Sequence, residues 1–583
     1  MSYLDRPRLT FFGQFTANPS TINNTPPNYG EPLPYNTDDQ NQPPGYVAWN
    51  SYGRHNFSLD NCAVTNVVMD GQGDSDTLQG ALVTTQYGVL VDLDTQQQGV
   101  SQIIGMQLTV SIGGGSVSGL FATTNFADMF VRINGASSND AMSGDGKFAA
   151  SYQSVLVNLC WNEGGSNFLK ALKAASPSML SIRFNVDAFH DGTTEGTFTS
   201  GRVAGTIGPY FDGEPTTFTN ARFLRPLNAK SQFGSYNFAP AKYDAKRGVL
   251  TIDLGNAIPT TWPSGQWPTS AVPTVQVATL DFQGMGKGRN PQPTYTVNTL
   301  LTPAVTTSDA AYQTTAFVAE LTVPESLQST IGSTPLGVVS PDKKPVLVMA
   351  ENPTGAYANA EEWVFRMNPG EIASTTLWAN HFGTPAAGVE IPLVAYTAMI
   401  GGGGFPVQKP KNAVQFPATL RTRADGTATV LFQAGNPKNP RGPIDGQVYG
   451  FQWQWSEDVL RDPWAFFSVK AFDAVKIPDA PTWWDDVFPI LRQYAYLYAA
   501  MRQIIEIDDY QQVVANLSAI IDRLTMPEGS PFYMPITREL SRDKLAILLK
   551  WAESPVEGTN PNPPPPLPWP PHVPPQPAQP KTA

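Results

Sequence analysis

The sequence comprises 583 residues with a formal net charge of −12, and it contains no cluster of lysine and arginine. This excludes nucleic acid and anionic membrane surfaces as partners, because both are recognised through clustered positive charge. Hydrophobic residues make up 41% of the chain, which excludes a disordered protein, while 49 glycines and 54 prolines favour short elements joined by turns.

The cysteines and the amino terminus point to a reducing compartment. Cys62 and Cys160 alone cannot form a four-ligand zinc site. The four histidines show no ligand spacing with a cysteine or with one another: His55, His190, His381 and His572. The amino terminus lacks the apolar segment of a secretory signal, and no stretch reaches the ~18 apolar residues of a membrane helix. We expect a cytoplasmic protein with free thiols.

The first half of the chain has a β pattern. Residues 1–60 are expected to form an amino-terminal arm with a first strand at 9–15, followed by a segment at 18–45 that is too rich in proline and asparagine for a helix or a central strand. Residues 61–235 are predicted to form a β domain, in which 181–189 alternate cleanly. A single short helix is predicted at 167–175.

Two further β regions follow. Residues 236–345 are predicted to form a second β domain or a continuation of the first. Residues 346–475 are predicted to form an immunoglobulin-like β-sandwich, because the spacing of strands and turns suits that fold. Its clearest strand patterns lie at 344–353, 388–397 and 426–435.

The pattern changes to a helical period in the helical module predicted at 476–553. One helix is expected around Leu491–Ile505, a second around Val513–Leu524 after the capping residues Asp508 and Asp509, and a third from Ser541. Residues 531–540, with two prolines, are expected to cross between helices in extended form. Residues 554–583 form a proline-rich tail, which is either a linker in the polyproline II conformation or a ligand for a proline-binding groove.

The predicted fold class is therefore mainly β: a multidomain, β-sandwich-like architecture with a small carboxy-terminal helical module. Within it, Asp70, Asp74 and Asp76 would offer oxygens to a calcium ion. Their spacing does not match an EF-hand loop, which also needs a distal glutamate. A solvated turn between two strands is the favoured interpretation.

Other segments carry residue types that occur in active sites. The four glycines at 401–404 lack the lysine and the strand–helix frame of a phosphate-binding loop. The serines of 113–119 lack the spacing of a nucleophile elbow. His190 adjoins Asp191 in a loop, where adjacent side chains rarely orient one another. Surface loops are favoured in each case.

Two acidic pairs and a tyrosine group are interpreted as turns, caps or packing residues: Glu361–Glu362, Asp485–Asp486, and Tyr494, Tyr496 and Tyr498. The predicted carboxy-terminal helices hold no histidine, so the Glu-x-x-His pairs of a ferritin-like di-iron site are absent from them. No catalytic residue is identified, and no residue is predicted to hold a cofactor or a metal.

Several sequence blocks share their order and rough spacing with one protein family. They are SYLDRPRLTFFGQFTANPSTINN at 2–24, GRHNFSLDNCAVTNVVMDG at 53–71, GRVAGTIGP at 201–209 followed by ARFLRP, LGNAIP at 254–259, and FYMPITRELSRDKLAILLK at 532–550. These blocks resemble the long amino-terminal region of the iminophenylpyruvate dimer synthases. The violacein-pathway enzyme of that family couples two imine molecules derived from indolepyruvate. The resemblance runs in patches from about residue 2 to about residue 553 and is weak over 260–480.

The resemblance also shows a departure. In that family a ferritin-like carboxy-terminal domain follows a proline-rich linker, whereas this sequence stops within the linker at Ala583. The domain expected to carry metal chemistry lies outside the sequence, so no family catalytic residue is carried over onto it.

The matching charged residues are interpreted as structural. Asp5 with Arg8, and Arg538 with Glu539, are expected to make charge-assisted bonds that join the arm and the helices to the β core; Arg6 and Pro7 belong to the same motif. The alternative is that these arginines bind a ligand, since arginine commonly recognises carboxylates.

The expected function is a non-catalytic scaffold or accessory subunit related to this family, acting with a separate ferritin-like partner or as a homo-oligomer in an assembly. One alternative is an enzyme of amino-acid-derived pigment or alkaloid biosynthesis that couples indolic imines in a cleft between β domains. The second alternative is a self-assembling protein or a cargo or defence interaction protein.

Overall fold

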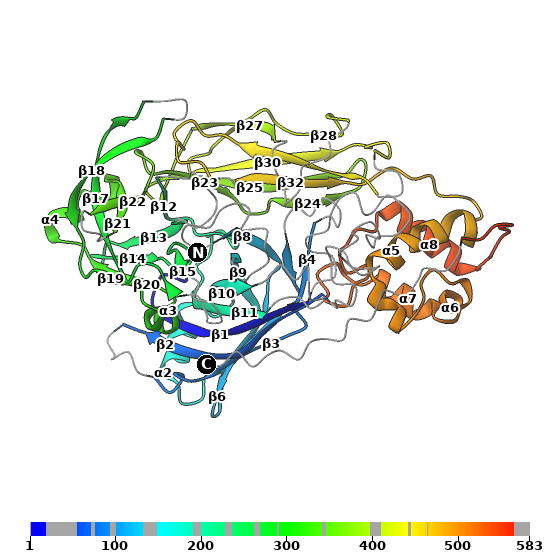
Figure 1. Cartoon of the computed structure of the whole chain (residues 1–583), viewed down its shortest axis with the longest axis horizontal. Coiled ribbons are helices and arrows are strands. Elements are labelled where there is room, and N and C mark those ends of the chain that lie inside the picture. Colours follow the sequence, from blue (N-terminus) through cyan, green and yellow to red (C-terminus); the bar gives the residue numbers. More distant parts are fainter. Residues whose placement is uncertain are drawn as a thin grey trace.

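The structure is a computed structural model. It describes residues 2–18, 55–70, 76–93, 101–131, 148–189, 200–227, 236–261, 269–287, 291–340, 345–396, 408, 410–440, 445–462 and 465–564. The predicted fold class is confirmed, because strands dominate the described chain and the longer helices gather near its carboxy-terminal end (Figure 1). Within these ranges, no helix has the length and apolar character needed to cross a membrane.

The first unit is an eleven-stranded sheet that closes on itself, and we call it the closed sheet. Its strands are β1 (Arg8–Asn18), β2 (Asn56–Val68), β3 (Leu82–Gln86), β4 (Val89–Val91), β5 (Gln102–Ile104), β6 (Gln107–Ile112), β7 (Gly115–Phe121), β8 (Thr124–Val131), β9 (Phe148–Asn162), β10 (Leu180–Phe189) and β11 (Ser200–Pro209). The order is β1-β11-β10-β9-β7-β6-β3-β2-β4-β5-β8, and the pairs β1–β2 and β8–β9 complete the closure. The predicted first strand is therefore an integral member of this sheet. Helix α2 (Asn167–Ala175) matches the predicted helix residue for residue.

The closed sheet has one apolar and one polar face, and along β9 and β10 both faces are buried. Alternate residues such as Tyr152 and Phe184 pack into its large apolar core. Their neighbours Ser151, Arg183 and Asn185 point to the other face, yet none is more than 6% exposed. The clean alternation predicted for 181–189 therefore separates two buried environments, an apolar core and a polar interface.

The second unit is a nine-stranded sheet, here called the second sheet. Its strands are β12 (Arg222–Pro226), β13 (Ala239–Asp244), β14 (Val249–Asp253), β17 (Thr274–Met285), β18 (Pro293–Leu300), β19 (Val305–Thr306), β20 (Val318–Thr322), β21 (Leu336–Ser340) and β22 (Val346–Ala350). Around it lie the pair β15 (Thr260–Thr261) and β16 (Thr269–Ser270), the helices α3 (Asp309–Thr315) and α4 (Glu325–Gln328), and the short turn η2 (Ile331–Ser333). The structure places β12, which lies within the range predicted for the first β domain, in this second sheet.

The third unit is a sandwich of two five-stranded sheets within the range predicted for it. The strand predicted for it at 344–353 is an exception, because this strand is β22 and pairs within the second sheet. One sheet contains β23 (Ala356–Ala360), β25 (Ile372–His381), β26 (Thr384–Pro385), β28 (Val414–Gln415) and β30 (Thr427–Ala434). The other contains β24 (Val364–Met367), β27 (Glu390–Tyr396), β29 (Thr419–Arg421), β31 (Gln447–Trp453) and β32 (Phe466–Ala471). Aromatic side chains such as Phe432, Phe451 and Phe467 fill the space between the sheets.

The helical module follows the sandwich. It comprises the π-helical turn η3 (Trp483–Val487), α5 (Phe488–Leu497), the 3-10 turn η4 (Ala499–Gln503), α6 (Tyr510–Ala515), α7 (Leu517–Leu524) and α8 (Arg542–Glu553). The predicted cap Asp509 accepts a hydrogen bond from the amide of Gln512, and Ser541 is the residue before α8. Residues 531–540 form successive turns, so the predicted extended crossing is wrong. The prolines break the helix there, but the buried side chains fold the segment back on itself.

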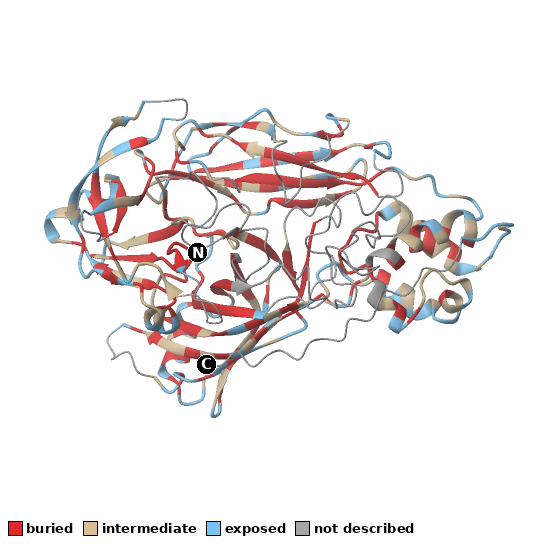
Figure 2. Cartoon of the chain, viewed as in Figure 1, coloured by how far each residue is buried: buried red, intermediate tan, exposed pale blue. Residues whose placement is uncertain are grey.

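The units pack directly against one another. Val364, Val448 and Phe466 of the sandwich belong to the apolar core of the closed sheet, and Val91 and Ile104 of the closed sheet belong to the core of the helical module. Figure 2 shows buried residues within each of the units. The sandwich and the helical module therefore each pack directly against the closed sheet.

Candidate functional site: a cleft between three units

A cleft of about 490 Å³ opens where the closed sheet, the sandwich and the helical module meet. The residues that line it come from β5, from β24 and β25, and from the turns before α8: Gln102, Ile104, Thr123, Glu362, Val364–Met367, Glu371–Ser374, Glu528, Gly529 and Arg538. Because three units contribute, the cleft exists only in the assembled chain.

Arg538 is the most unusual residue of this cleft. Only 2% of it is exposed, and its guanidinium group donates to three backbone carbonyls: those of Glu528 (Nε, 2.9 Å), Ser530 (Nη2, 2.5 Å) and Ile536. Among the described residues no carboxylate forms an ion pair with it. Its backbone lies in the left-handed region (φ 57°), which is costly for a residue with a Cβ atom. A buried cation without a carboxylate partner is a costly arrangement that a bound anion would relieve.

Arg366 adds a second positive charge to the same cleft. Along β24, Phe365 and Met367 point into the sandwich core, so the intervening Arg366 points outward. There its Nη1 donates to Gln102 Oε1 (2.7 Å) and its Nη2 to the carbonyl oxygen of Asp92 (3.1 Å), both on the closed sheet. Arg366 thus ties two units together while it lines the cleft.

The two guanidinium groups act on each other. Burial, followed by the positive charge of Arg366, lowers the pKa of Arg538 to about 10. Because arginine side chains stay protonated in proteins, the two positive charges repel each other. An anion placed between two guanidinium groups receives charge-assisted hydrogen bonds from both.

Three carboxyl groups share the lining. Burial, followed by the nearby Glu361, raises the pKa of Glu362 above its usual range. Glu371 is engaged, because it accepts from the amide of Asn368 (2.7 Å) and from Arg542 Nη1 (3.0 Å). The cleft therefore offers positive charge at the arginines, with carboxyl groups at its margins.

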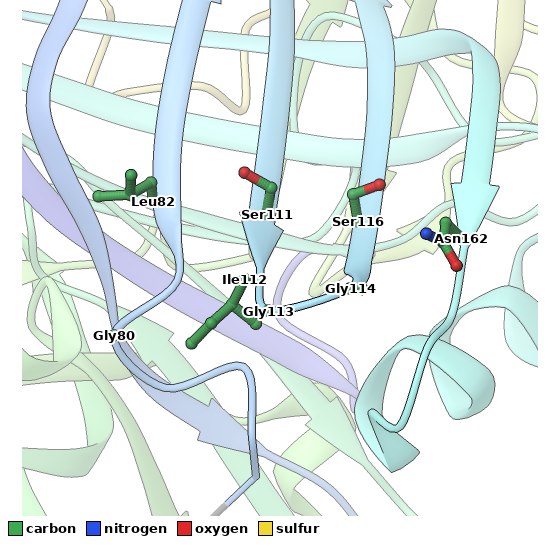
Figure 3. Close-up of a pocket in the computed structure, with 9 residues that line it drawn as sticks. Gly80, Leu82, Ser111, Ile112, Gly113, Gly114, Ser116 and Asn162 are labelled. Carbon is green, nitrogen blue, oxygen red and sulfur yellow. The ribbon is translucent and has the colours of Figure 1, made fainter.

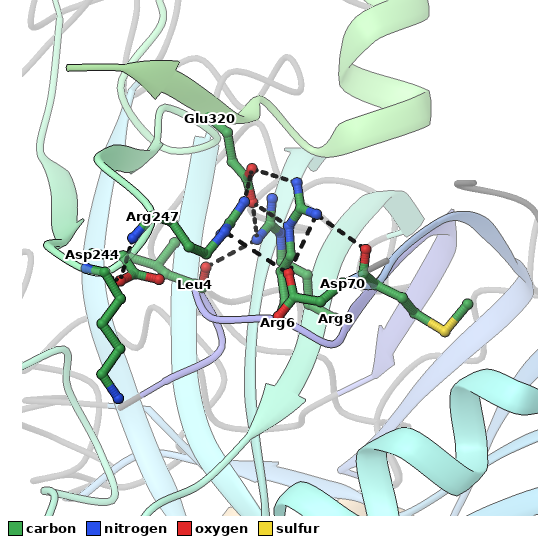
Figure 4. A network of polar contacts seen from close by, with 9 residues as sticks. Leu4, Arg6, Arg8, Asp70, Asp244, Arg247 and Glu320 are labelled. Atoms are coloured by element: carbon green, nitrogen blue, oxygen red, sulfur yellow. Dashed lines mark hydrogen bonds and ion pairs between the residues drawn. The ribbon is translucent and has the colours of Figure 1, made fainter. Parts of the chain in front are cut away.

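The amino-terminal arginines have a different role. Glu320 of β20 accepts from Arg6 (2.6 and 2.9 Å), pairs with Arg8 (2.9 Å) and accepts from Arg247 (2.8 Å), as Figure 4 shows. Although burial acts to raise it, the hydrogen bonds from Arg6 and Arg247 and the charge of Arg8 hold the pKa of Glu320 far below its usual range. The predicted structural role is confirmed, since this network joins the arm to the second sheet.

The predicted pairing within each charged motif is wrong. Asp5 binds Lys242 Nζ (2.5 Å) and does not pair with Arg8. Glu539 binds Lys470 Nζ (2.6 Å), and both side chains are at most 1% exposed. In both motifs the carboxylate binds a lysine on a distant strand, Lys242 or Lys470, and not the arginine of its own motif. The Lys470–Glu539 pair joins the helical module to the sandwich.

The aspartates considered as calcium ligands make other contacts in the structure. Asp76 accepts from the hydroxyl of Ser166 (2.8 Å) and from the amides of Leu78, Asn167 and Phe168, so it caps α2. Although burial acts to raise it, these hydrogen bonds lower the pKa of Asp76. Asp70 lies 3.5 Å from Arg6 Nη1, and Asp74 lies outside the described residues.

The glycine–serine segment forms a hairpin. Gly113 and Gly114 make the turn between β6 and β7, and Ser111 pairs with Ser116 across the two strands. A shallow surface hollow lies beside them, lined also by Leu82 (Figure 3). Its serines are hairpin residues at the surface, and His190, Asp191 and the glycines at 401–404 fall outside the described residues.

The remaining candidates make structural contacts. Glu361 accepts from the amide of Thr216 (2.6 Å), Asp486 accepts from the amide of Thr482 (2.8 Å), and Tyr498 bonds to the hydroxyl of Thr537. Both cysteines are free, and burial raises the pKa of the Cys62 thiol to about 12. Within the described ranges, no three or more His, Cys, Asp or Glu side chains gather as a metal-binding group.

Sequence reasoning missed Arg366 and the cleft itself. Nothing in the short segment around β24 distinguishes Arg366 from a surface residue. A weak signal exists on β32, where Lys470 is the one charged residue in a mainly apolar strand that is buried throughout. A charge inside such a run indicates a buried ionic partner.

Comparisons with known proteins do not show a family for this chain. No family model matches, and no curated protein matches. One similar solved structure is trypsin-activated alpha-2-macroglobulin from Escherichia coli, at 10% sequence identity and a TM-score of 0.13. The match covers 81% of this chain and 37% of that chain.

Proposed function

We propose that this chain is a non-catalytic scaffold or accessory subunit, related to the iminophenylpyruvate dimer synthases, that binds a carboxylate-bearing ligand in the cleft between its three units. It would act with a separate ferritin-like partner or within an assembly. The observation that carries the proposal is Arg538, which is buried, has no carboxylate partner among the described residues and lies near the guanidinium group of Arg366 in a cleft.

The chemistry of the cleft favours binding over bond-making. Arginine stays protonated at neutral pH and presents several donors in a fixed plane, which suits a carboxylate but not proton transfer. The carbonyls of Glu528, Ser530 and Ile536 hold the Arg538 guanidinium in place. The resemblance of residues 532–550 to the synthase family adds independent support, because this block carries Arg538.

The test is to incubate the purified chain with the imine of indolepyruvate and to search for coupled products by mass spectrometry. The proposal predicts no product from the chain alone and product only when a ferritin-like protein from the same source is added. Turnover by the isolated chain would favour the alternative, in which the chain is itself an enzyme of pigment or alkaloid synthesis.

A further inference from the structure

A second polar site lies on the buried polar face of the closed sheet, away from the cleft. Asp128 on β8, Ser151 on β9 and Asn185 on β10 stand in one row, since Ser151 is the register partner of both other residues. Neighbouring strands lie about 4.8 Å apart, so the two outer side chains flank Ser151 closely. The row is covered by the second sheet, through Asn256 in the turn after β14 and Asn237 before β13.

Within the described part of the chain, four oxygen atoms at this place have no hydrogen-bond partner. They are Asp128 Oδ1, Ser151 Oγ, Asn185 Oδ1 and Asn256 Oδ1, each with less than 1 Å² of accessible surface. The four residues are between 0% and 4% exposed. Single buried polar atoms without a hydrogen bond occur in many proteins. Each such group lowers the folding stability by roughly 1–3 kcal/mol, so a cluster of four is unusual and indicates a bound group.

The charge at this place is also unbalanced. Asp128 Oδ2 accepts from the amide nitrogens of Asn237 and Asn256 (2.7 Å for the latter), which are both neutral. Arg183, whose positive charge acts on Asp128, makes its own contacts elsewhere: its Nε lies 3.3 Å from Asp253 Oδ2 and its Nη1 donates to Gln153. Among the described residues Asp128 has no ion pair. Burial, followed by the charge of Asp462, raises its pKa to about 7.

We propose that Asp128, Ser151, Asn185 and Asn256 bind a hard cation, such as sodium, potassium, magnesium or calcium, between the closed sheet and the second sheet. Carboxylate, amide and hydroxyl oxygens are the ligands that these ions prefer. A single cation would coordinate the four unpartnered oxygens and would also neutralise the carboxylate of Asp128. A proton on Asp128 would satisfy only part of the set, because a carboxylic acid has a single hydrogen to donate.

Gly255 supports the close approach that such a site needs. A Cβ atom at this position would meet the side-chain amide of Asn185 at 2.6 Å and the carbonyl oxygen of Ala316 at 2.7 Å. The absence of a side chain therefore lets the turn that carries Asn256 settle onto the row on the closed sheet. The ion would link the closed sheet to the second sheet.

The test is thermal unfolding of the full chain after exhaustive dialysis against a chelator, at constant ionic strength maintained with choline chloride. Sodium, potassium, magnesium and calcium chlorides are then added in separate arms. We expect at least one ion to raise the melting temperature by several degrees in a saturable way. Asp128→Asn should abolish that rise, whereas Asp479→Asn, at an exposed position, should retain it.

A second variant keeps the proposal testable if Asp128→Asn fails to fold. Asn256→Asp adds a carboxylate to the site, so it should destabilise the ion-free protein and make the response to a divalent ion at least tenfold more sensitive. No ion response in the wild-type protein would overturn the proposal. So would an Asp128→Asn variant that is more stable than the wild type in every arm, since that result means a protonated carboxyl group.

Discussion

Three guanidinium groups meet one carboxylate at Glu320, and this cluster shows how single residues connect the units. Arg6 and Arg8 come from the first residues of the chain, while Arg247 and Glu320 belong to the second sheet (Figure 4). The carboxylate is 17% exposed in its side chain, so solvent screens these pairs only partly. These ion pairs hold the amino-terminal arm against the second sheet, whose residues come more than two hundred positions later in the sequence.

The depressed pKa of Glu320 predicts a loss of stability in acid. A carboxyl group whose pKa is lowered on folding adds stability above its unfolded value of about 4.3, and this stability is lost as the pH falls towards the folded value. We expect the free energy of unfolding to fall below about pH 4.5 in the wild type, with a flatter dependence in Glu320→Gln. Denaturant unfolding between pH 3 and pH 7 measures this difference. Parallel curves for the two proteins would show that Glu320 is not the titrating group.

The buried pair of Lys470 and Glu539 gives a second prediction at this scale. Removal of one partner from a buried ion pair is costly, because the remaining charge loses its closest ionic contact, so Lys470→Met should lower the free energy of unfolding by about 3–5 kcal/mol. The double variant Lys470→Met with Glu539→Leu removes both charges and should recover most of that loss. Urea unfolding of the three proteins decides the matter, and strictly additive losses would contradict a direct ionic partnership.

The sequence indicated which charged residues are structural but not which partners they have. Arg6, Arg8 and Glu539 stand in distinctive motifs, so their importance is visible in the sequence. Their partners Glu320 and Lys470 lie on strands that come close only when separate units pack together. Arg366 stands in an ordinary β pattern, and its place in the cleft follows from the same packing.

At the scale of elements, strands and helices with a clear period were predictable. The helix at Asn167–Ala175 and the helix that begins after Ser541 follow from the spacing of their apolar residues. The segment 531–540 was not predictable, because its two prolines exclude a helix but do not distinguish an extended chain from successive turns. Its residues are held by contacts with distant parts of the chain, such as the hydrogen bonds of Thr537 with Tyr498 and of Glu539 with Lys470.

The junction between α8 and the proline-rich tail carries a prediction about truncation. The carbonyl of Val556 accepts from the amide of Trp483 (2.8 Å) and from the indole of Trp551 (3.0 Å), and that of Glu557 accepts from the amide of Trp484 (3.3 Å). At about 1 kcal/mol for each hydrogen bond, a chain that ends at Ser554 should lose about 3 kcal/mol and melt several degrees lower.

A chain that ends at residue 564 retains these bonds and serves as the control. It should melt like the full chain, because the residues beyond consist largely of proline and cannot build a core. Equal melting temperatures for both truncations would mean that the bonds of Val556 and Glu557 do not stabilise the module. A large loss on removal of residues 565–583 alone would show that the tail itself packs against the protein.

At the scale of the whole molecule, the arrangement of the units could not be predicted from the sequence. Alternation along a strand shows that two faces differ, but it does not show that the polar face is buried, as the face with Arg183 and Asn185 is. Closure of the first sheet depends on pairs between strands far apart in the chain, such as β1 with β11. The cleft of Arg366 and Arg538 arises from this packing of units and from no local motif.

Calorimetric titration of phenylpyruvate into the full chain tests the central claim, that this junction binds a carboxylate. We predict saturable binding that is lost for the methyl ester of the same compound. Binding should be at least tenfold weaker in Arg366→Gln, since a hydrogen bond between charged groups contributes about 1.5–3 kcal/mol. The matched variant Arg421→Gln, on an exposed strand position of the sandwich, should bind like the wild type. Equal affinity for the acid and its ester, or an unchanged affinity in Arg366→Gln, would contradict the account.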